Sequence, residues 1–222
     1  MLRTFTLNEV WILVLAARWT IALSLAAFAG GGTVGFILAI ARISPFRVLR
    51  YVVSGYIQFV QAIPSLMLLL LFYYGLNLFG IRIDAWTAAV LAFTLSTSAF
   101  LAEIWRGCLQ AVPAGQWDAA RSLGLNFPKT LILVIIPQAV RMALPPTVGY
   151  MVQVVKGTSL AALIGFTELA KAGAQINTVT FEPVLVFGTV AGIYFLICWP
   201  LSLLSGYLER QLKVGHVNIQ AM

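Results

Sequence analysis

Long apolar stretches separated by short polar segments make up most of this chain. Five of the stretches contain few or no charged residues, and each is long enough as a helix to cross about 30 Å of hydrocarbon. We therefore predict five transmembrane helices. They cover residues 19–41, 51–76, 85–102, 142–166 and 183–208.

Two shorter apolar runs, over residues 10–17 and 131–140, are too short to cross a bilayer. We interpret them as interfacial or packed segments. The fourth long stretch is less regular than the others, because it has Pro145 and Pro146 near its start and Lys156 in its apolar part.

The composition indicates a bilayer environment for the whole chain. Of the 222 residues, 61% are hydrophobic and 9% are charged, and the mean hydropathy is +0.95. Soluble domains of this size do not have such a balance. The chain is predicted to be an all-α, multi-pass integral membrane protein with one domain over residues 1–222.

The distribution of Lys and Arg predicts the orientation. One set of loops carries nine of these cations and the other set carries four, with Lys156 left inside a span. The side with nine is predicted to be cytoplasmic, so the N-terminus lies outside and the C-terminus inside. Cations at helix ends meet anionic lipid, and the net charge of +7 therefore does not indicate nucleic-acid binding.

One loop on the predicted cytoplasmic side, over about residues 106–141, contains the longest hydrophilic segment. Within it, residues 116–123 suit a short helix that Gly124 would end. Ala119 and Ala120 give this helix a surface of little volume, which suits docking into a groove of another protein. A surface helix that merely links two spans is the alternative.

The motifs of this loop resemble a known family. Residues 116–124 (QWDAARSLG), followed by IPQA at residues 136–139 and by Arg141, are similar to the EAA loop of ABC importer permeases. Further segments resemble the polar amino acid branch of that family. They are residues 56–64, 72–75, 103, 106–107, 112–113, 144–146, 156–160, 168–169 and 208–210. Three residues depart from the family's usual Glu, Arg and Asn, namely Asp118, Gln61 and Gly149.

The resemblance implies a type I ABC importer transmembrane domain in the bacterial inner membrane, which translocates polar amino acids or related compounds. It also implies that the loop forms a coupling helix seated in the ATP-binding subunit. The residues of this coupling segment are Gly115, Gln116, Trp117, Asp118, Ala119, Ala120, Arg121, Leu123 and Gly124.

The partners implied by the resemblance are a dimer of ATP-binding subunits, a second permease subunit, identical or paralogous, and a periplasmic or lipid-anchored solute-binding protein. ATP and Mg are expected in the partner ATPase, and this chain is expected to hold no cofactor or metal.

Polar residues within the predicted spans are candidates for a solute pathway, because such side chains are costly in hydrocarbon. The candidates are Gln58, Gln61, Pro64, Glu103, Gln153, Lys156, Thr158 and Ser159. For Lys156, a pathway role and snorkelling to the interface both stay open.

Structural alternatives exist for the other candidates and for a glycine cluster. Glu103 and Arg106 are spaced to pair with each other. Gln58 and Gln61 share a helical face near Pro64, which can kink the helix, and interhelical packing would explain them equally well. The glycines at residues 30–32 and Gly35 allow close helix approach, which we expect at an interface between subunits.

The groups needed for enzyme chemistry are missing from the pattern. The single histidine, His216, lies in the predicted C-terminal tail, and residues 156–159 (KGTS) lack the glycine spacing of a phosphate loop. ATP hydrolysis is therefore expected in a partner chain. The alternative function is an ATP-independent secondary carrier or channel, although the spans show no inverted repeat.

Overall fold

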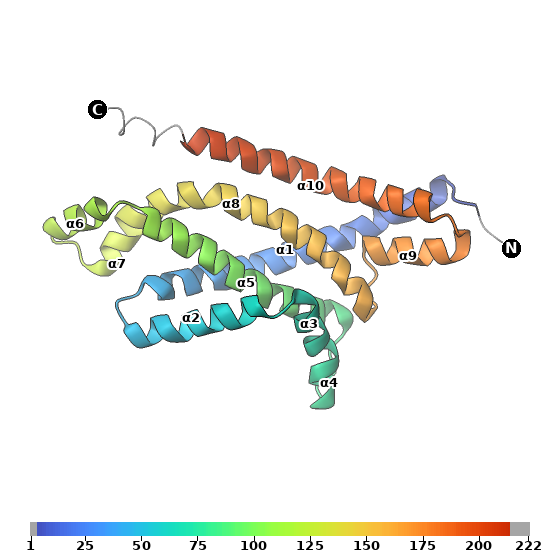
Figure 1. Ribbon diagram of the computed structural model, residues 1–222, viewed down its shortest axis with the longest axis horizontal. Helices are drawn as coiled ribbons and strands as arrows, with labels where there is room; N and C mark the ends of the chain where they lie inside the picture. The colour runs from blue at the N-terminus through green and yellow to red at the C-terminus, as the bar shows by residue number, and fades with distance from the viewer. Residues whose placement is uncertain (1–3, 214–222) are drawn as a thin grey trace.

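The computed structural model describes residues 4–213, and all regular secondary structure in that range is helical. Most helices lie along one long axis, with α1 beginning at one end of the bundle and α10 ending at the other (Figure 1). A helix satisfies its own backbone N–H and C=O groups, as a chain in lipid requires. His216 lies outside the described residues.

The long helices are α1 (Leu7–Ile43), α2 (Arg47–Ala62), α5 (Ala85–Ala111), α8 (Ile136–Gly157) and α10 (Pro183–Lys213). Shorter elements connect them. These are α3 (Ser65–Leu70), a π-helical turn (Leu71–Gly75) and α4 (Leu76–Leu78) after α2; α6 (Ala114–Ser122), α7 (Phe127–Thr130) and a second π-helical turn (Leu131–Ile135) before α8; and a 3₁₀ segment (Thr158–Ile164) and α9 (Leu169–Thr180) before α10.

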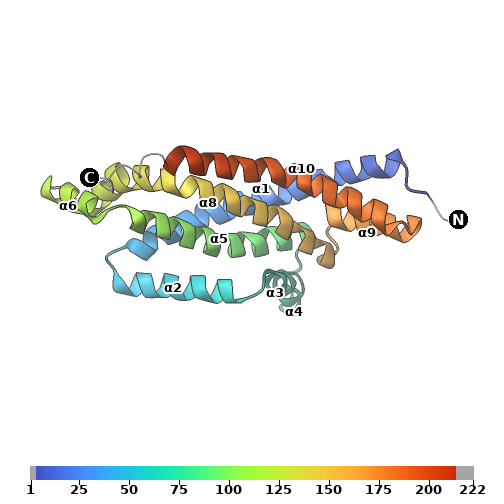
Figure 2. The same cartoon turned by 45° about the horizontal axis from the view of Figure 1, so that its top comes forward.

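Four continuous helical stretches of the described chain are long and apolar enough to cross a membrane: Leu7–Ile43, Ala85–Ala111, Phe127–Ile164 and Pro183–Leu212. The predicted second span differs from these, because α2 and Ser65–Leu78 meet the same criteria only together and are bent by 97°. Figure 2 shows α3 and α4 turned away from the direction of α2.

Pro64 explains this break. Proline has no backbone N–H and disfavours a helical conformation at the residue before it, and Ile63 is accordingly extended, with ψ of 126°. The kink expected at Pro64 is therefore present, and it is sharp enough to separate α2 from α3 as two helices.

Both short apolar runs belong to long helices, so the prediction that they form separate segments is wrong. Residues 10–17 are part of α1, because the charges around them are accommodated: Glu9 accepts a hydrogen bond from the Thr6 N–H (2.9 Å), and the Arg18 guanidinium lies 5.5 Å from the centre of the Trp19 ring. Residues 131–140 lie in the stretch Phe127–Ile164, where the π-helical turn Leu131–Ile135 comes just before Pro137. A local change of helix type lets a helix continue past a proline, which has no N–H.

These longer helices shorten the loop predicted over residues 106–141. α5 extends to Ala111, and the next helical stretch begins at Phe127.

The other end of α5 begins after Asp84, whose carboxylate accepts hydrogen bonds from the Thr87 hydroxyl (2.6 Å) and from the Thr87 backbone N–H (3.2 Å). These bonds lower the pKa of the Asp84 carboxyl below its usual value.

Close packing of α1 on α5 forms the centre of the bundle. A Cβ added at Gly31 would lie 2.5 Å from Thr97 Cβ, and one at Gly35 would lie 2.9 Å from the Ser98 carbonyl oxygen. Only glycine allows helices to approach this closely. The expectation that these glycines face another subunit is wrong for Gly31 and Gly35, which are buried within the chain.

Candidate functional site

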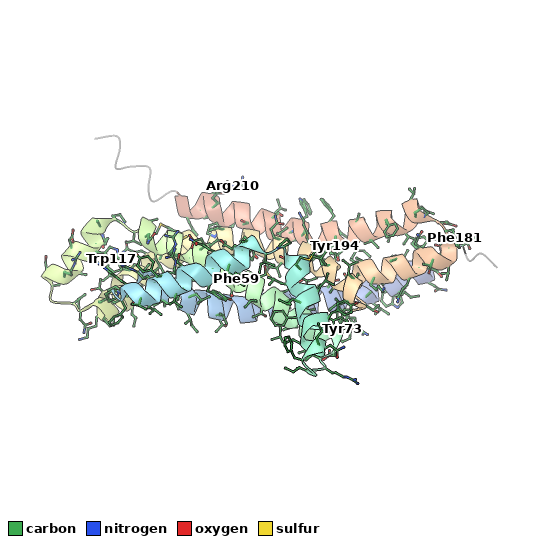
Figure 3. The ribbon with its side chains drawn as sticks, turned by 60° about the horizontal axis from the view of Figure 1, so that its bottom comes forward. Phe59, Tyr73, Trp117, Phe181, Tyr194 and Arg210 are labelled. Carbon is green, nitrogen blue, oxygen red and sulfur yellow. The ribbon has the colours of Figure 1, made fainter. Side chains whose placement is uncertain are left out.

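α6 protrudes at the end of the bundle where α1 and α10 also end (Figure 1). The side of α6 that faces the bundle, called its inner face, packs against neighbouring helices. Ala120 is only 2% exposed. Trp117, labelled in Figure 3, is half-buried and stacks on Phe127 of α7 with ring centres 6.1 Å apart. Trp117 also packs against the buried cluster that includes Leu109 and Ile135. α6 is therefore held against the bundle by large apolar contacts.

The outer face of α6 carries small residues. Gly115, Ala119 and Ser122 lie on one side of the helix and are exposed, and the Leu123 side chain beyond its end is 80% exposed. Asp118 and Arg121 form an exposed ion pair at 2.8 Å beside this side, and the Arg121 side chain lies toward Trp117. This side offers little side-chain volume and one apolar residue, as suits close contact with another protein.

The predicted helix over residues 116–123 is present as Ala114–Ser122, and Gly124 ends it as expected. Gly124 has a positive φ of 74°, and the Leu125 N–H closes the helix end on the Ala120 carbonyl at 3.1 Å. The prediction that both alanines form one docking surface is wrong, because Ala120 faces inward and only Ala119 faces outward.

A polar stripe follows α2 toward its break. It consists of Arg47, Arg50, Ser54, Gln58 and Gln61, which recur every three or four residues and so share one side of the helix. The stripe flanks the buried face of α2 and leaves an exposed apolar face that includes Phe59, labelled in Figure 3.

Two members of this stripe have different surroundings. The Gln61 amide donates a hydrogen bond to the Ala99 carbonyl (3.3 Å), so Gln61 connects α2 to α5. Gln58 is exposed, and Pro64 is exposed just beyond the stripe. Gln58 is therefore better placed than Gln61 to meet a solute.

Lys156 lies in the last turn of α8, and its side chain is exposed. It borders a cavity of about 550 Å³ whose other lining comes from α10, including Tyr194, Phe195 and Trp199. No ion pair of Lys156 with another described residue is present. The Lys156 ammonium and the aromatic side chains of α10 therefore border the same cavity between α8 and α10.

Two of the other polar candidates near Lys156, Thr158 and Ser159, do not share its position. Thr158 is fully buried and donates to the Val155 carbonyl (2.7 Å), whereas Ser159 donates to the Lys156 carbonyl (2.8 Å). Gln153 is exposed. The two hydroxyls are therefore engaged by backbone carbonyls of the preceding helical turn, and of the polar candidates in this segment only Gln153 is exposed together with Lys156.

Glu103 and Arg106 pair on α5, which confirms their structural interpretation. The Arg106 Nε donates to both carboxylate oxygens at 3.0 Å, and the guanidinium also donates to Gln110 Oε1. Because its carboxylate is engaged by Arg106, Glu103 is less available to a solute.

Glu168 is an interaction centre that the pattern of residues did not identify. It is fully buried at the start of α9, where its carboxylate accepts hydrogen bonds from the Ala170 and Lys171 N–H groups, both at 2.9 Å. It also accepts from the Tyr194 hydroxyl of α10 (2.8 Å) and the Thr20 hydroxyl of α1 (3.3 Å). Residues 168–169 belong to the segments that resemble the permease family, but neither the resemblance nor the helical spacing gave Glu168 a role.

Comparison with known proteins connects this geometry to a family. Residues 31–214 match the model of the binding-protein-dependent transport system inner membrane component. The chain belongs to this family. The permease is 36% identical to the L-cystine transport system permease protein TcyB of Bacillus subtilis (strain 168), over 87% of this chain and 83% of that protein. It is 30% identical to the glutamine transport system permease protein GlnP of Escherichia coli (strain K12), over 95% and 99% of the two chains.

Solved structures agree with this assignment. The permease superposes on an amino acid ABC transporter crystallised with histidines, with a TM-score of 0.86 and 33% identity over 92% of this chain and 96% of that one. The inward-facing MetNI methionine ABC transporter has the same fold, with a TM-score of 0.80 at 18% identity, over 94% and 99% of the chains. The permease is thus a multi-pass inner-membrane subunit of an ABC transporter, and it works with a separate ATPase and a solute-binding protein.

Proposed function

We propose that this permease imports polar amino acids or closely related compounds. The observation that carries the proposal is similarity along most of the chain to permeases named for L-cystine and glutamine transport, together with 33% identity to a solved amino acid transporter. The relatives named above are ABC permeases, so the ATP-independent carrier or channel has no support.

The proposed topology has five crossings, with the N-terminus outside and the C-terminus inside. The broken pair at Pro64 would be the second crossing. Two observations support this topology: α1 begins and α10 ends at opposite ends of the bundle, and the cations at residues 42, 47, 50, 121 and 141 belong to elements near the α6 end.

The proposed coupling element is the outer face of α6. Two copies of a permease, identical or paralogous, would each present α6 to one of two ATP-binding subunits, which hold ATP and Mg. The small exposed side chains of Gly115 and Ala119 support close docking, and the Trp117 contacts support transmission of force to the bundle.

The proposed solute pathway follows the part of the polar stripe of α2 that holds Gln58 and Gln61, next to the break at Pro64. Gln58 is the member of this stripe whose amide side chain is exposed near the break. A break in a helix frees backbone carbonyls for a polar solute, which supports a pathway at this point. Lys156 is a second candidate, on a different flank.

Reconstitution tests the proposal directly. The permease, its ATP-binding subunit and its solute-binding protein are placed in proteoliposomes, and uptake is measured for glutamine, arginine, glutamate, cystine and an opine, with leucine as the apolar control. ATP-dependent uptake of one or more polar solutes is expected. Uptake that does not require ATP, or uptake of leucine alone, would contradict the proposal.

A further inference from the structure

A basic cavity lies at the base of α6, apart from the outer face of that helix. Its volume is about 590 Å³, and it is bounded by the end of α1, the start of α2, the end of α5 and the inner side of α6. The polar groups that line it are Arg42, Arg50, Tyr51, Ser54, Gln110 and Trp117. None of the lining residues is acidic.

The lining offers hydrogen-bond donors in excess. Guanidinium and indole groups only donate, and hydroxyls can donate. The Gln110 side chain accepts from Arg106 through its carbonyl oxygen, which leaves its NH₂ group available to donate. The Arg42 Nε is buried and has no hydrogen-bond partner in the described residues. Glu103 interacts with Arg42 electrostatically, but both of its oxygens accept from Arg106.

A buried donor without a partner is costly, and a cavity rich in donors and cations fits a ligand that only accepts hydrogen bonds and is negatively charged. Phosphate oxygens have this chemistry. A phosphate held here would accept hydrogen bonds from the guanidinium groups of Arg42 and Arg50 and contact the inner side of α6 through Trp117.

The surroundings of the cavity indicate that the phosphate belongs to a lipid. The cavity lies where the spanning stretch Leu7–Ile43 ends and α2 begins, which is the level of lipid headgroups. The start of α2 also exposes an apolar surface, on the side of the helix beyond the cavity-lining Tyr51: Phe46 is 71%, Val48 77% and Val52 65% exposed. An acyl chain can lie on this surface while its headgroup enters the cavity.

We propose that this cavity binds the phosphate of an anionic phospholipid, and that the bound headgroup supports α6 from its inner side. This inference goes beyond the proposed transport function. It rests on the proposed function in one respect: the proposed orientation places the bound lipid in the cytoplasmic leaflet. Lipid binding can be measured without transport, so either proposal can fail alone.

The test is lipid retention by the full chain purified with its ATP-binding partner from nanodiscs that contain phosphatidylglycerol and phosphatidylcholine. Native mass spectrometry reports the lipids that stay bound. Wild type is expected to retain phosphatidylglycerol selectively. R42Q/R50Q should weaken this binding by roughly thirtyfold. R50Q alone, which leaves Arg42 in place if Arg42 is needed for folding, should weaken it by about fivefold. R47Q is the matched control, because Arg47 is an exposed cation of the same helix that does not line the cavity.

Three outcomes would overturn the proposal. Equal retention of phosphatidylglycerol by wild type and both cavity variants would show that the lipid binds elsewhere. Stabilisation by millimolar inorganic phosphate in phosphatidylcholine alone, with no preference for phosphatidylglycerol, would assign the cavity to a free anion. Loss of the ATP-binding partner from R42Q/R50Q with unchanged lipid retention would show that a carboxylate of that partner is the occupant.

Discussion

Single side chains set how closely the helices of this permease approach and how its buried charge is stabilised. Gly31 and Gly35 bring α1 onto α5, and Glu168 joins α1, α9 and α10 through four hydrogen bonds. The sequence showed the glycines but not their partner, because spacing does not say which helix a small residue faces. It gave no role to Glu168, since its donors Thr20 and Tyr194 are far from it in the chain.

Gly31→Val is expected to destabilise the bundle, because the new side chain would overlap Thr97. Overpacking of this kind costs about 1–3 kcal/mol. Gly32→Val is the control on the next residue, where an added Cβ would lie 3.8 Å from Leu101 Cδ1, an ordinary contact. Thermal unfolding of the detergent-purified variants measures both. Equal melting temperatures for the two variants would contradict the close approach at Gly31.

Glu168→Ala is expected to destabilise the link between α1, α9 and α10, because the buried hydroxyl and N–H donors lose their acceptor. Each unsatisfied buried donor costs about 1–3 kcal/mol. Tyr194→Phe removes one donor and leaves Glu168 with its other partners, so its effect should be smaller, about 1 kcal/mol. Hydrogen exchange of the α9 amides is the measurement. Unchanged protection in Glu168→Ala would show that Glu168 does not hold α9.

Helix α6 shows how an element can be predicted while the direction of its faces is not. The local signals of Pro113, Ala119 and Gly124 predict a short helix, and the helix is present within two residues of the expected bounds. Its inner face depends on Trp117 packing against Phe127 and on the cluster around Ile135, contacts between segments that no helical period reveals. The structure therefore assigns Ala119 and Ala120 to opposite sides.

Ala119→Trp is expected to weaken association with the ATP-binding subunit while the permease stays folded, because the outer face of α6 would be held away from its partner. Ala120→Trp should instead reduce the amount of folded permease, since Ala120 is buried in the chain. Co-purification of the partner and gel-filtration yield of the permease are measured for both. Normal partner binding by Ala119→Trp would exclude this face of α6 as the docking surface.

For the whole molecule, the unequal distribution of cations predicts the orientation in the membrane. Cysteines are introduced singly at Asn77 and Gln116 after Cys108 and Cys198 are replaced by alanine. The Asn77→Cys variant is expected to react with an impermeant thiol reagent added outside intact cells, and Gln116→Cys only after the membrane is opened. The reverse labelling would invert the topology and remove the basis for α6 as the coupling element.

The sequence alone determined that the chain is helical, lies in a membrane and resembles ABC importer permeases, because hydropathy, helix-ending residues and local motifs act over a few neighbouring residues. Only the tertiary structure decided that residues 10–17 and 131–140 extend long helices and that the second span breaks by 97° at Pro64. It also decided that Thr158 is buried away from Lys156 and that Arg42 and Arg50 share a cavity with Trp117. The burial of Thr158 and the shared cavity depend on contacts between residues far apart in the chain, and the periodicity of a single helix contains no information about its neighbours. Pro64 and the charges near residues 10–17 are local signals, but they do not determine how sharply a helix bends or whether it continues.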